Sequence, residues 1–487
     1  MKKLLLTLFV VMLAGVSLAQ PLSGDKMIPG DYNSIVEAVD DLNLNGVDSP
    51  GVTFLIESDY VEEITAPITI TVTGTSAAPI VFQKNGGGNN PVITRTDGGS
   101  LNTTSFGAAG DAIIRMEGTD FITFDGISLT ANLQGIEYGY LTHKPSGTDG
   151  CQNVTIKNAV VTMNRGNSGV VIGIYIGNGS VSTTSATGVT VTSLAGKNAN
   201  ILITGNTVQG AHSALVFRGS SASGFADDNI TIGVSGEGNL LHNYGGGHVS
   251  SAHGVYMIYA TNVNISYNTF DNSGGEGSPH NSTLYGVFLS SGVTGDIVMN
   301  NNDITLANTA ASSGSQGLYS ANTATSYTVN NNTFSSGTIT STGTLYLIYL
   351  SSSCQNVNVS GNQINGTFTR SSASGTMYAY YNNGSPGSGT ENIYNNDFSN
   401  ISVSGTGTFY GIYSNTAAGH TANIYNNVVS TITAGTGTIY GVYGAIANTR
   451  SIYGNDIYGF NNSGIIYGIY VSGGNPALVY NNEVYNL

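Results

Sequence analysis

Two short motifs recur in the C-terminal third of the chain, and this repetition constrains the fold more than any other feature. One motif carries an asparagine shortly after an Ile-Tyr pair, and the other has the form apolar-Tyr-Gly-apolar-Tyr. The copies are Asn392–Phe398 with Phe409–Tyr413, Asn423–Asn427 with Ile439–Tyr443, and Ser451–Asn455 with Ile466–Tyr470. A chain that repeats itself in this way is a stack of equivalent units. The sequence therefore predicts a solenoid.

An asparagine marks the same point of each unit. The recurring residues are Asn158, Asn206, Asn239, Asn268, Asn302, Asn332, Asn362, Asn396, Asn427, Asn455 and Asn482. In Ile201–Val208 the apolar positions alternate and then reverse phase around the asparagine, which indicates a strand, a sharp corner and a second strand. No leucine skeleton or propeller period is present. We therefore expect an all-β parallel solenoid whose corner asparagines form an internal ladder, with Gly177–Asn200 as a protruding loop or an extra layer.

The N-terminus has the pattern of a secretory signal peptide. Lys2 and Lys3 precede an apolar run from Leu4 to Val16, and small residues end at Ala19. This run is shorter than a membrane span. We therefore expect residues 1–19 to be a signal peptide and the mature protein to be exported without membrane insertion.

A short helix is expected before the first strands. Ser34 and Glu37 have the spacing of a capping box, and Ile35, Ala38 and Leu42 fall on one helical face. Such a helix can cover the open first layer of a solenoid or pack beside it. The expected organisation is a signal peptide over residues 1–19, a cap with the first strands over 20–110, and β-helix repeats over 111–487.

The charge of the chain excludes several partners. The formal net charge is −15, only 8% of residues are charged, and Arg370 and Arg450 are the only basic residues after Arg218. Nucleic acids and anionic membranes require clustered Lys and Arg. We therefore expect neither as a partner.

The two cysteines occupy equivalent positions in different repeats. Cys151 and Cys354 each begin a Cys-Gln-Asn-Val sequence. About six layers at ~4.8 Å per layer separate them, which is too far for a disulfide. We expect two separate buried thiols.

Several N-terminal segments resemble a known group of proteins. These segments are Tyr32–Leu42, Gly51–Ile56, Tyr60–Ile64 and Gly74–Ile80. Together with the repeats, they are similar to exported bacterial right-handed parallel β-helix surface proteins of the pectin-lyase-like superfamily, in a group associated with type IX secretion. The resemblance implies a right-handed β-helix with a short N-terminal capping helix, secreted or held at the cell surface. Members of the group often end in a sorting domain, whereas this chain ends at Leu487 inside a repeat, so we expect a C-terminal truncation.

The Tyr-Gly-apolar-Tyr strands give the principal candidate binding surface. One aligned aromatic column contains Tyr175, Tyr259, Phe288, Tyr349, Tyr381, Tyr413, Tyr443 and Tyr470. Alternation along a strand predicts that this column faces solvent and that the first tyrosine of the motif faces inward. The motif glycines Gly173, Gly286, Gly411, Gly441 and Gly468 would then border a shallow groove. The column could stack on sugar rings, or its rings could stack on one another and shield the sheet.

No catalytic group is predicted, and the only candidates are Asp227, Asp228 and His248. An Asp pair followed by Gly-His loosely resembles polygalacturonase-type glycosidases, but the aspartate expected upstream falls at Val208. Adjacent turn residues need not flank a scissile bond. A lyase base would have to come from Arg165, Lys197 or Arg218, and calcium would be expected only in such a lyase.

The histidines give no metal motif. His242, His248 and His253 lie close together in the sequence with Glu237 upstream, without the spacing of a metal site. We expect solvated loop histidines, and neither a metal nor a cofactor.

Two functions remain open at this point. The first is an extracellular or cell-surface structural or adhesive β-helix that contacts a polysaccharide or cell-surface glycan through its tyrosines. The alternative is a polysaccharide lyase or glycoside hydrolase of the same superfamily.

Overall fold

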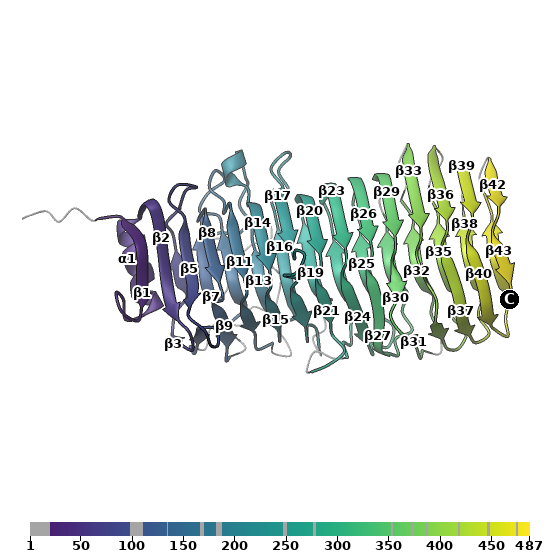
Figure 1. Cartoon of the computed structure of the whole chain (residues 1–487), viewed down its shortest axis with the longest axis horizontal. Helices are drawn as coiled ribbons and strands as arrows, with labels where there is room; N and C mark the ends of the chain where they lie inside the picture. Colours follow the sequence, from purple (N-terminus) through teal and green to yellow (C-terminus); the bar gives the residue numbers. More distant parts are fainter. Residues whose placement is uncertain are drawn as a thin grey trace, which may run out of the picture.

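The computed structural model describes most of the chain. The described residues are 20–97, 111–133, 135–165, 170–181, 188–246, 251–275, 279–351, 354–372, 374–384, 388–416, 419–445, 449–473 and 476–487. The predicted signal peptide lies outside them. All named strand pairs are parallel, and each coil contributes one strand to each of three faces. The predicted parallel β-helix is confirmed, and Figure 1 shows the coils in sequence order along one axis.

The first face, sheet 1, contains fifteen strands of the described chain. They are β1 (Leu22–Ile28), β2 (Val47–Glu57), β5 (Ile80–Asn85), β8 (Ile122–Asp125), β11 (Val154–Lys157), β14 (Ala199–Thr204), β17 (Asp227–Ile232), β20 (Ala260–Ser266), β23 (Thr294–Asn300), β26 (Ala324–Asn330), β29 (Cys354–Ser360), β33 (Gly389–Tyr394), β36 (His420–Tyr425), β39 (Thr449–Tyr453) and β42 (Ala477–Tyr480).

The second face, sheet 2, contains thirteen strands within the same described ranges. They are β4 (Ile68–Ile70), β7 (Ala112–Glu117), β10 (Tyr138–His143), β13 (Ile172–Ile176), β16 (Ser213–Arg218), β19 (Ala252–Ile258), β22 (Leu284–Leu289), β25 (Ser315–Ser320), β28 (Leu345–Leu350), β32 (Met377–Asn382), β35 (Phe409–Ser414), β38 (Ile439–Gly444) and β41 (Ile466–Val471).

The third face is divided into a ten-stranded and a five-stranded part, counted over the described residues. The first part is β3 (Val61–Ile64), β6 (Val92–Arg95), β9 (Ser128–Ala131), β12 (Val160–Thr162), β15 (Thr207–Gln209), β18 (Leu240–His242), β21 (Thr269–Asp271), β24 (Asp303–Asn308), β27 (Thr333–Ile339) and β30 (Gln363–Ile364). The second part is β31 (Phe368–Arg370), β34 (Ile401–Val403), β37 (Val428–Ala434), β40 (Asp456–Asn461) and β43 (Glu483–Tyr485).

The short helix α1 (Ile35–Asn45) lies beside β1 at the N-terminal end of the solenoid (Figure 1). Ser34 Oγ accepts a hydrogen bond from the Glu37 amide (3.0 Å), as the capping-box spacing predicts. The carboxylate of Glu62, on β3, accepts from the amides of Ile35 and Val36 at 2.7 and 3.1 Å. Because the first amides of a helix are positively polarised, this buried carboxylate fixes the helix against the first coil. The apolar face of α1 joins the main core.

Asparagine corners connect the coils, as the sequence predicts. Each ladder residue donates through Nδ2 to Oδ1 of the asparagine one coil further on, at 2.8–3.1 Å. The ladder contains Asn206, Asn239, Asn268, Asn302, Asn332, Asn362, Asn396, Asn427, Asn455 and Asn482. Each of these amides from Asn206 to Asn455 is buried and paired, so the ladder holds the coils from Asn206 to Asn482 in the same register.

Asn158 is not a member of this ladder, so its assignment there is wrong. The backbone amide of Ala159 donates to Asn206 Oδ1 in its place, at 3.0 Å. Asn158 has a φ of 58°, as Asn395 has a φ of 55° directly before the ladder residue Asn396. Asparagine tolerates this left-handed conformation. In an Asn-Asn pair, therefore, the first asparagine forms the corner with a positive φ and the second asparagine belongs to the ladder.

The segment Gly177–Asn200 adds no layer within its described residues. It contains a single short 3-10 helix, η1 (Leu194–Gly196), which protrudes at the upper edge of the solenoid in Figure 1. Strand β14 then continues sheet 1 directly from β11.

Candidate functional site

The Tyr-Gly-apolar-Tyr motif forms the strands of sheet 2 in the C-terminal half. In β35, Gly411 and Ile412 are both buried, whereas Tyr410 and Tyr413 are partly exposed. Strict alternation of side chains therefore fails at the Gly-Ile pair. The second tyrosine faces outward as predicted, but the prediction that the first tyrosine faces inward is wrong.

The motif glycines pack closely against the interior at this local exception. A Cβ at Gly411 would lie 2.7 Å from Cγ1 of Val429 and 2.6 Å from the carbonyl oxygen of Gly441. Both distances are well below ordinary contact distances for carbon, so a side chain at Gly411 would require its neighbours to shift. Leu347 and Ala379 occupy the same position of β28 and β32 and are also buried, so the inward pair itself does not require glycine. The motif glycines are all buried, and none borders an outer groove: Gly173, Gly286, Gly411, Gly441 and Gly468. The prediction that these glycines border a shallow groove on the outer surface is wrong.

Two columns of aromatic side chains therefore run side by side on the outside of sheet 2, and we call them the aromatic face. The first column contains Tyr285, Tyr346, Tyr378, Tyr410, Tyr440 and Tyr467, with Gln316 between its first two members. The second column contains Tyr256, Phe288, Tyr319, Tyr349, Tyr381, Tyr413, Tyr443 and Tyr470. None of the strands from β22 to β41 in this sheet contains an acidic or basic residue.

The structure brings together six of the eight aromatic residues singled out from the sequence: Phe288, Tyr349, Tyr381, Tyr413, Tyr443 and Tyr470. Tyr175 lies on the same register line but is buried. Tyr259 follows the end of β19 with a φ of 55°, and Tyr256 occupies the column position instead. The sequence analysis also missed Tyr319. Tyr256 and Tyr319 carry the signal that marks most other members, an aliphatic residue directly before the ring.

The rings stack on one another along each column. Tyr378, Tyr410 and Tyr440 follow at centroid distances of 4.7 and 4.8 Å, with interplanar angles of 4° and 2°. Between the columns, the nearly parallel pair Tyr346–Tyr349 (18°) gives way to the T-shaped pair Tyr410–Tyr413 (84°). Both arrangements are favourable for aromatic rings. Since neighbours occupy the ring faces, the ring edges and hydroxyl groups are what the surface offers to a partner.

Burial keeps these phenols neutral. Burial, followed by the charges of neighbouring tyrosines, raises the pKa of Tyr285, Tyr346 and Tyr410 to about 12. A hydroxyl with this pKa stays protonated near neutral pH, where it can both donate and accept a hydrogen bond. The aromatic face is therefore an uncharged surface of regularly spaced hydroxyl groups.

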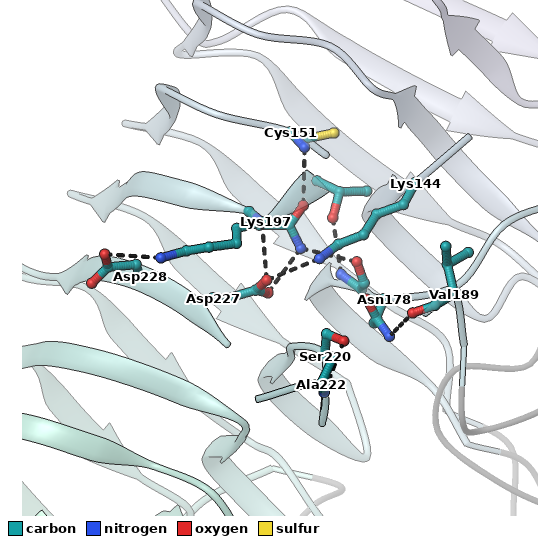
Figure 2. Close-up of polar contacts among 12 residues, drawn as sticks. Lys144, Cys151, Asn178, Val189, Lys197, Ser220, Ala222, Asp227 and Asp228 are labelled. Carbon is teal, nitrogen blue, oxygen red and sulfur yellow. Dashed lines mark hydrogen bonds and ion pairs between the residues drawn. The ribbon is translucent and has the colours of Figure 1, made fainter. Parts of the chain in front are cut away.

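The aspartates singled out as catalytic candidates point to opposite sides of β17 (Figure 2). Asp227 is fully buried and lies 3.0 Å from Lys144 Nζ, whereas Asp228 is partly exposed and lies 3.1 Å from Lys197 Nζ. Paired acid and base carboxylates must converge on one bond. These two do not converge, and His248 lies outside the described residues.

The three candidate lyase bases are separated as well. Lys197 is paired with Asp228, and Arg165 donates to the carbonyl of Asn243. Arg218 ends β16 on another face of the solenoid. The candidate residues that the structure describes therefore bring no two carboxylates together, and Lys197–Asp228 is the ion pair that they form.

The prediction of solvated loop histidines is wrong for His253. This residue lies on β19, is buried, and places Nδ1 3.0 Å from Ser213 Oγ. Its ring stacks on Tyr285 at 5.1 Å, at the N-terminal end of the aromatic face. Burial, then the nearby His212 and His280, lower its pKa well below the usual value.

The cysteines and possible metal ligands offer no further site. Cys151 and Cys354 are buried and unbridged, as expected. Over the described ranges, no group of three or more His, Cys, Asp or Glu side chains could hold a metal ion. In the same part of the chain, no helix is long and apolar enough to span a membrane.

Comparisons with known proteins find solved structures that this chain resembles in fold. No protein-family model matches the chain, and no curated protein matches its sequence. The GH136 lacto-N-biosidase from Eubacterium ramulus is 11% identical with a TM-score of 0.40, over 93% of this chain and 64% of that one, so the chain spans less than two thirds of that protein. The surface adhesin PfbA of Streptococcus pneumoniae is 14% identical with a TM-score of 0.38, over 91% and 96% of the two chains. A mannuronic acid specific polysaccharide family 6 lyase from human gut microbiota is 10% identical with a TM-score of 0.35, over 92% and 86%. Similarities this low concern the fold alone and assign no activity.

Proposed function

We propose that this chain is an exported, non-catalytic adhesive rod that binds a neutral polysaccharide along its aromatic face. The proposed mature protein begins after a signal peptide of residues 1–19, with a cap over residues 20–110 and β-helix repeats over 111–487. It would act outside the cell or at the cell surface.

The aromatic face is the observation that supports this function. Its eight coils from β19 to β41 extend over about 34 Å at strand spacing. Neutral hydroxyl groups and ring edges can hydrogen-bond and pack against sugar hydroxyl and CH groups. An extended polymer would meet the same chemistry at every coil, so weak contacts would add along its length.

The charge distribution favours a neutral ligand over a uronic acid polymer. The chain carries a net charge of −15, and the strands of the aromatic face contain no cation. An anionic polysaccharide would be repelled without local compensation. A neutral polysaccharide would not be repelled by the negative charge of the chain.

The test is titration calorimetry of the purified chain against soluble neutral and uronic acid polysaccharides. The variant carries Tyr410→Ala with Tyr440→Ala. The matched control is Tyr394→Ala with Tyr425→Ala, which removes an equally well stacked pair (5.0 Å, 3°) from sheet 1. We expect the face variant to weaken binding about tenfold, equivalent to about 1.4 kcal/mol, and the control to change it little. Equal losses in both variants, or no neutral ligand for the parent chain, would contradict the proposal.

A depolymerisation screen over the same polysaccharides checks the non-catalytic part. We expect no release of reducing ends and no unsaturated products. Turnover by the native protein that is lost after heat inactivation would establish the lyase or hydrolase alternative.

A further inference from the structure

One buried cluster is not explained by the aromatic face and is independent of the function proposed above. Lys144, Asp227 and Asn198 come from three consecutive coils and are each fully buried. Asp227 bridges the other two side chains: Oδ1 lies 3.0 Å from Lys144 Nζ, and Oδ2 accepts from Asn198 Nδ2 at 2.8 Å (Figure 2). A primary amine and a carboxamide are thus held on the two oxygens of one carboxyl group.

The amide carbonyl of Asn198 is polarised. Its Oδ1 accepts a hydrogen bond from the backbone amide of Cys151 at 3.0 Å. A fixed backbone N–H aimed at a carbonyl oxygen stabilises the negative charge that develops there when a nucleophile adds to the carbon. Asp227 is itself fixed, because Oδ1 also accepts from the backbone amide of Asn198 at 2.9 Å.

Attack on an amide carbon requires a neutral amine, and a proton acceptor beside Nζ can supply that form within the cluster. A Lys–Asp pair out of water is costly as two charges, and transferring one proton from Nζ to the carboxylate makes both groups neutral. A neutral amine is the reactive form, and the neutral carboxyl group is then a general acid next to Asn198 Nδ2.

We propose that Lys144 and Asn198 form an intramolecular isopeptide bond, with Asp227 as the proton-transfer group. Nζ first gives a proton to Asp227 and then attacks Cγ of Asn198, whose oxygen takes the negative charge. Asp227 delivers its proton to Nδ2 while receiving the second Nζ proton. The Cγ–Nδ2 bond breaks, the carbonyl re-forms, and one ammonia leaves; it takes the remaining proton from Asp227 as ammonium. No oxidant or other reactant is consumed.

A second, less buried triad lies on the other side of β17 and provides an internal control. Asp228 contacts Lys197 Nζ at 3.1 Å and accepts from Asn262 Nδ2 at 2.9 Å, the same connectivity as the buried cluster. Here Asn262 is exposed and the Asp228 side chain is 32% exposed, so water can solvate the amide and the carboxylate. We expect no bond at this site.

The experiment is tryptic peptide mapping of the purified full chain by tandem mass spectrometry. Cleavage is expected on both sides of residues 116–157 and 198–218 and not at Lys144, which precedes a proline. We expect one branched species joining these two peptides, lighter than their sum by one ammonia. Peptides that contain Lys197 and Asn262 should remain unbranched.

Three results would overturn the proposal. They are linear 116–157 and 198–218 peptides in the folded protein, a bond from Lys144 to Asp227 with loss of water, and an equal bond at the less buried triad. Intact mass alone does not decide, because asparagine and N-terminal glutamine also lose ammonia by cyclising; the branch point is read from fragment ions.

Variants test the role of Asp227. We expect Asp227→Asn to abolish the branched peptide and Asp228→Asn to leave it unchanged, with folding of both checked by circular dichroism. If Asp227→Asn does not fold, Lys144→Arg retains a cation beside Asp227 and should give only linear peptides. A branched peptide that persists in folded Asp227→Asn would contradict the proton-transfer role.

Discussion

The outer surface of sheet 2 differs between the two halves of the solenoid. On β10, β13 and β16 the outward side chains Tyr138, Leu141, Tyr175 and Val216 belong to a second buried apolar cluster, separate from the main core. From β22 onward the same register line carries the partly exposed aromatic face. Tyr175 and Tyr413 lie on this line, yet Tyr175 is only 1% exposed.

The two halves show that the direction of a side chain and its exposure to solvent are separate properties. Position along a strand determines the side to which a side chain points, whereas neighbouring segments determine whether water reaches it. Stacking occurs in both halves: Tyr138 and Tyr175 stack at 5.3 Å and 20°. We therefore infer that rings in the first half stabilise the fold as a core does, and rings in the second half remain available to a partner.

The largest expected effect comes from truncating one ring in each half. Tyr175→Ala should lower the free energy of unfolding by about 3–5 kcal/mol, because it leaves a cavity among buried side chains. Tyr413→Ala should cost about 1 kcal/mol, the contribution of a half-exposed stacked pair. Urea unfolding measures both.

Tyr175→Phe is the control for the buried site. The Tyr175 hydroxyl is buried and has no hydrogen-bond partner among the described residues, so its removal should be neutral or stabilising. Equal losses for the two alanine variants would remove the distinction between the halves.

A methyl group at Gly411 should have the next largest effect. Gly411→Ala places a carbon against Val429 and the Gly441 carbonyl, and such overpacking costs about 1–3 kcal/mol. Gly87→Ala, whose added carbon meets nothing within 4 Å, should change stability by less than about 0.5 kcal/mol. Thermal unfolding of the two variants tests whether Gly411 is required for close packing against Val429; a silent Gly411→Ala would show that it is not.

The smallest effect is a pH dependence of the aromatic face. Burial, then neighbouring phenols, raise the pKa of Tyr346 and Tyr410 from 10.0 to about 12. The folded state then binds more protons than the unfolded state above pH 10, so stability falls as pH rises. The stability that depends on the protonated phenols is fully present below pH 10 and is lost as the pH rises through about 12.

Ultraviolet difference titration of phenolate formation measures this effect. The Tyr410→Phe variant should lose one late-titrating group relative to the parent protein. Titration of all tyrosines near pH 10 in the folded protein would contradict the burial argument.

The repeat pattern was sufficient to predict the coil architecture and its asparagine ladder, because both depend on local spacing. The same reasoning failed at Gly411-Ile412, where two consecutive residues point inward. The same two consecutive inward positions occur in β28 with Leu347-Ile348 and in β32 with Ala379-Tyr380, so the exception belongs to the strand geometry of these coils and has no signal in the residue type. The position of the first tyrosine column followed from this one exception.

The buried cluster could not be predicted from the sequence for a different reason. Lys144 and Asp227 are 83 residues apart, and neither has a local motif. Asp227 and Asp228 look equivalent in the sequence, but adjacent strand positions send one into a dry interior and the other into solvent. Their surroundings are set by residues of neighbouring coils that are far away in the sequence.

The asparagine ladder has a consequence for how such a chain can change in length. Every rung uses the same donor and the same acceptor, so a duplicated coil placed between Asn427 and Asn455 would find both partners already in position. An added residue on an outer loop leaves the rung intact, and the separation of successive rungs indeed ranges from 27 to 34 residues. One residue added at the corner would misalign the rung. Whole-coil duplication is therefore the least disruptive route by which this rod could grow or shrink.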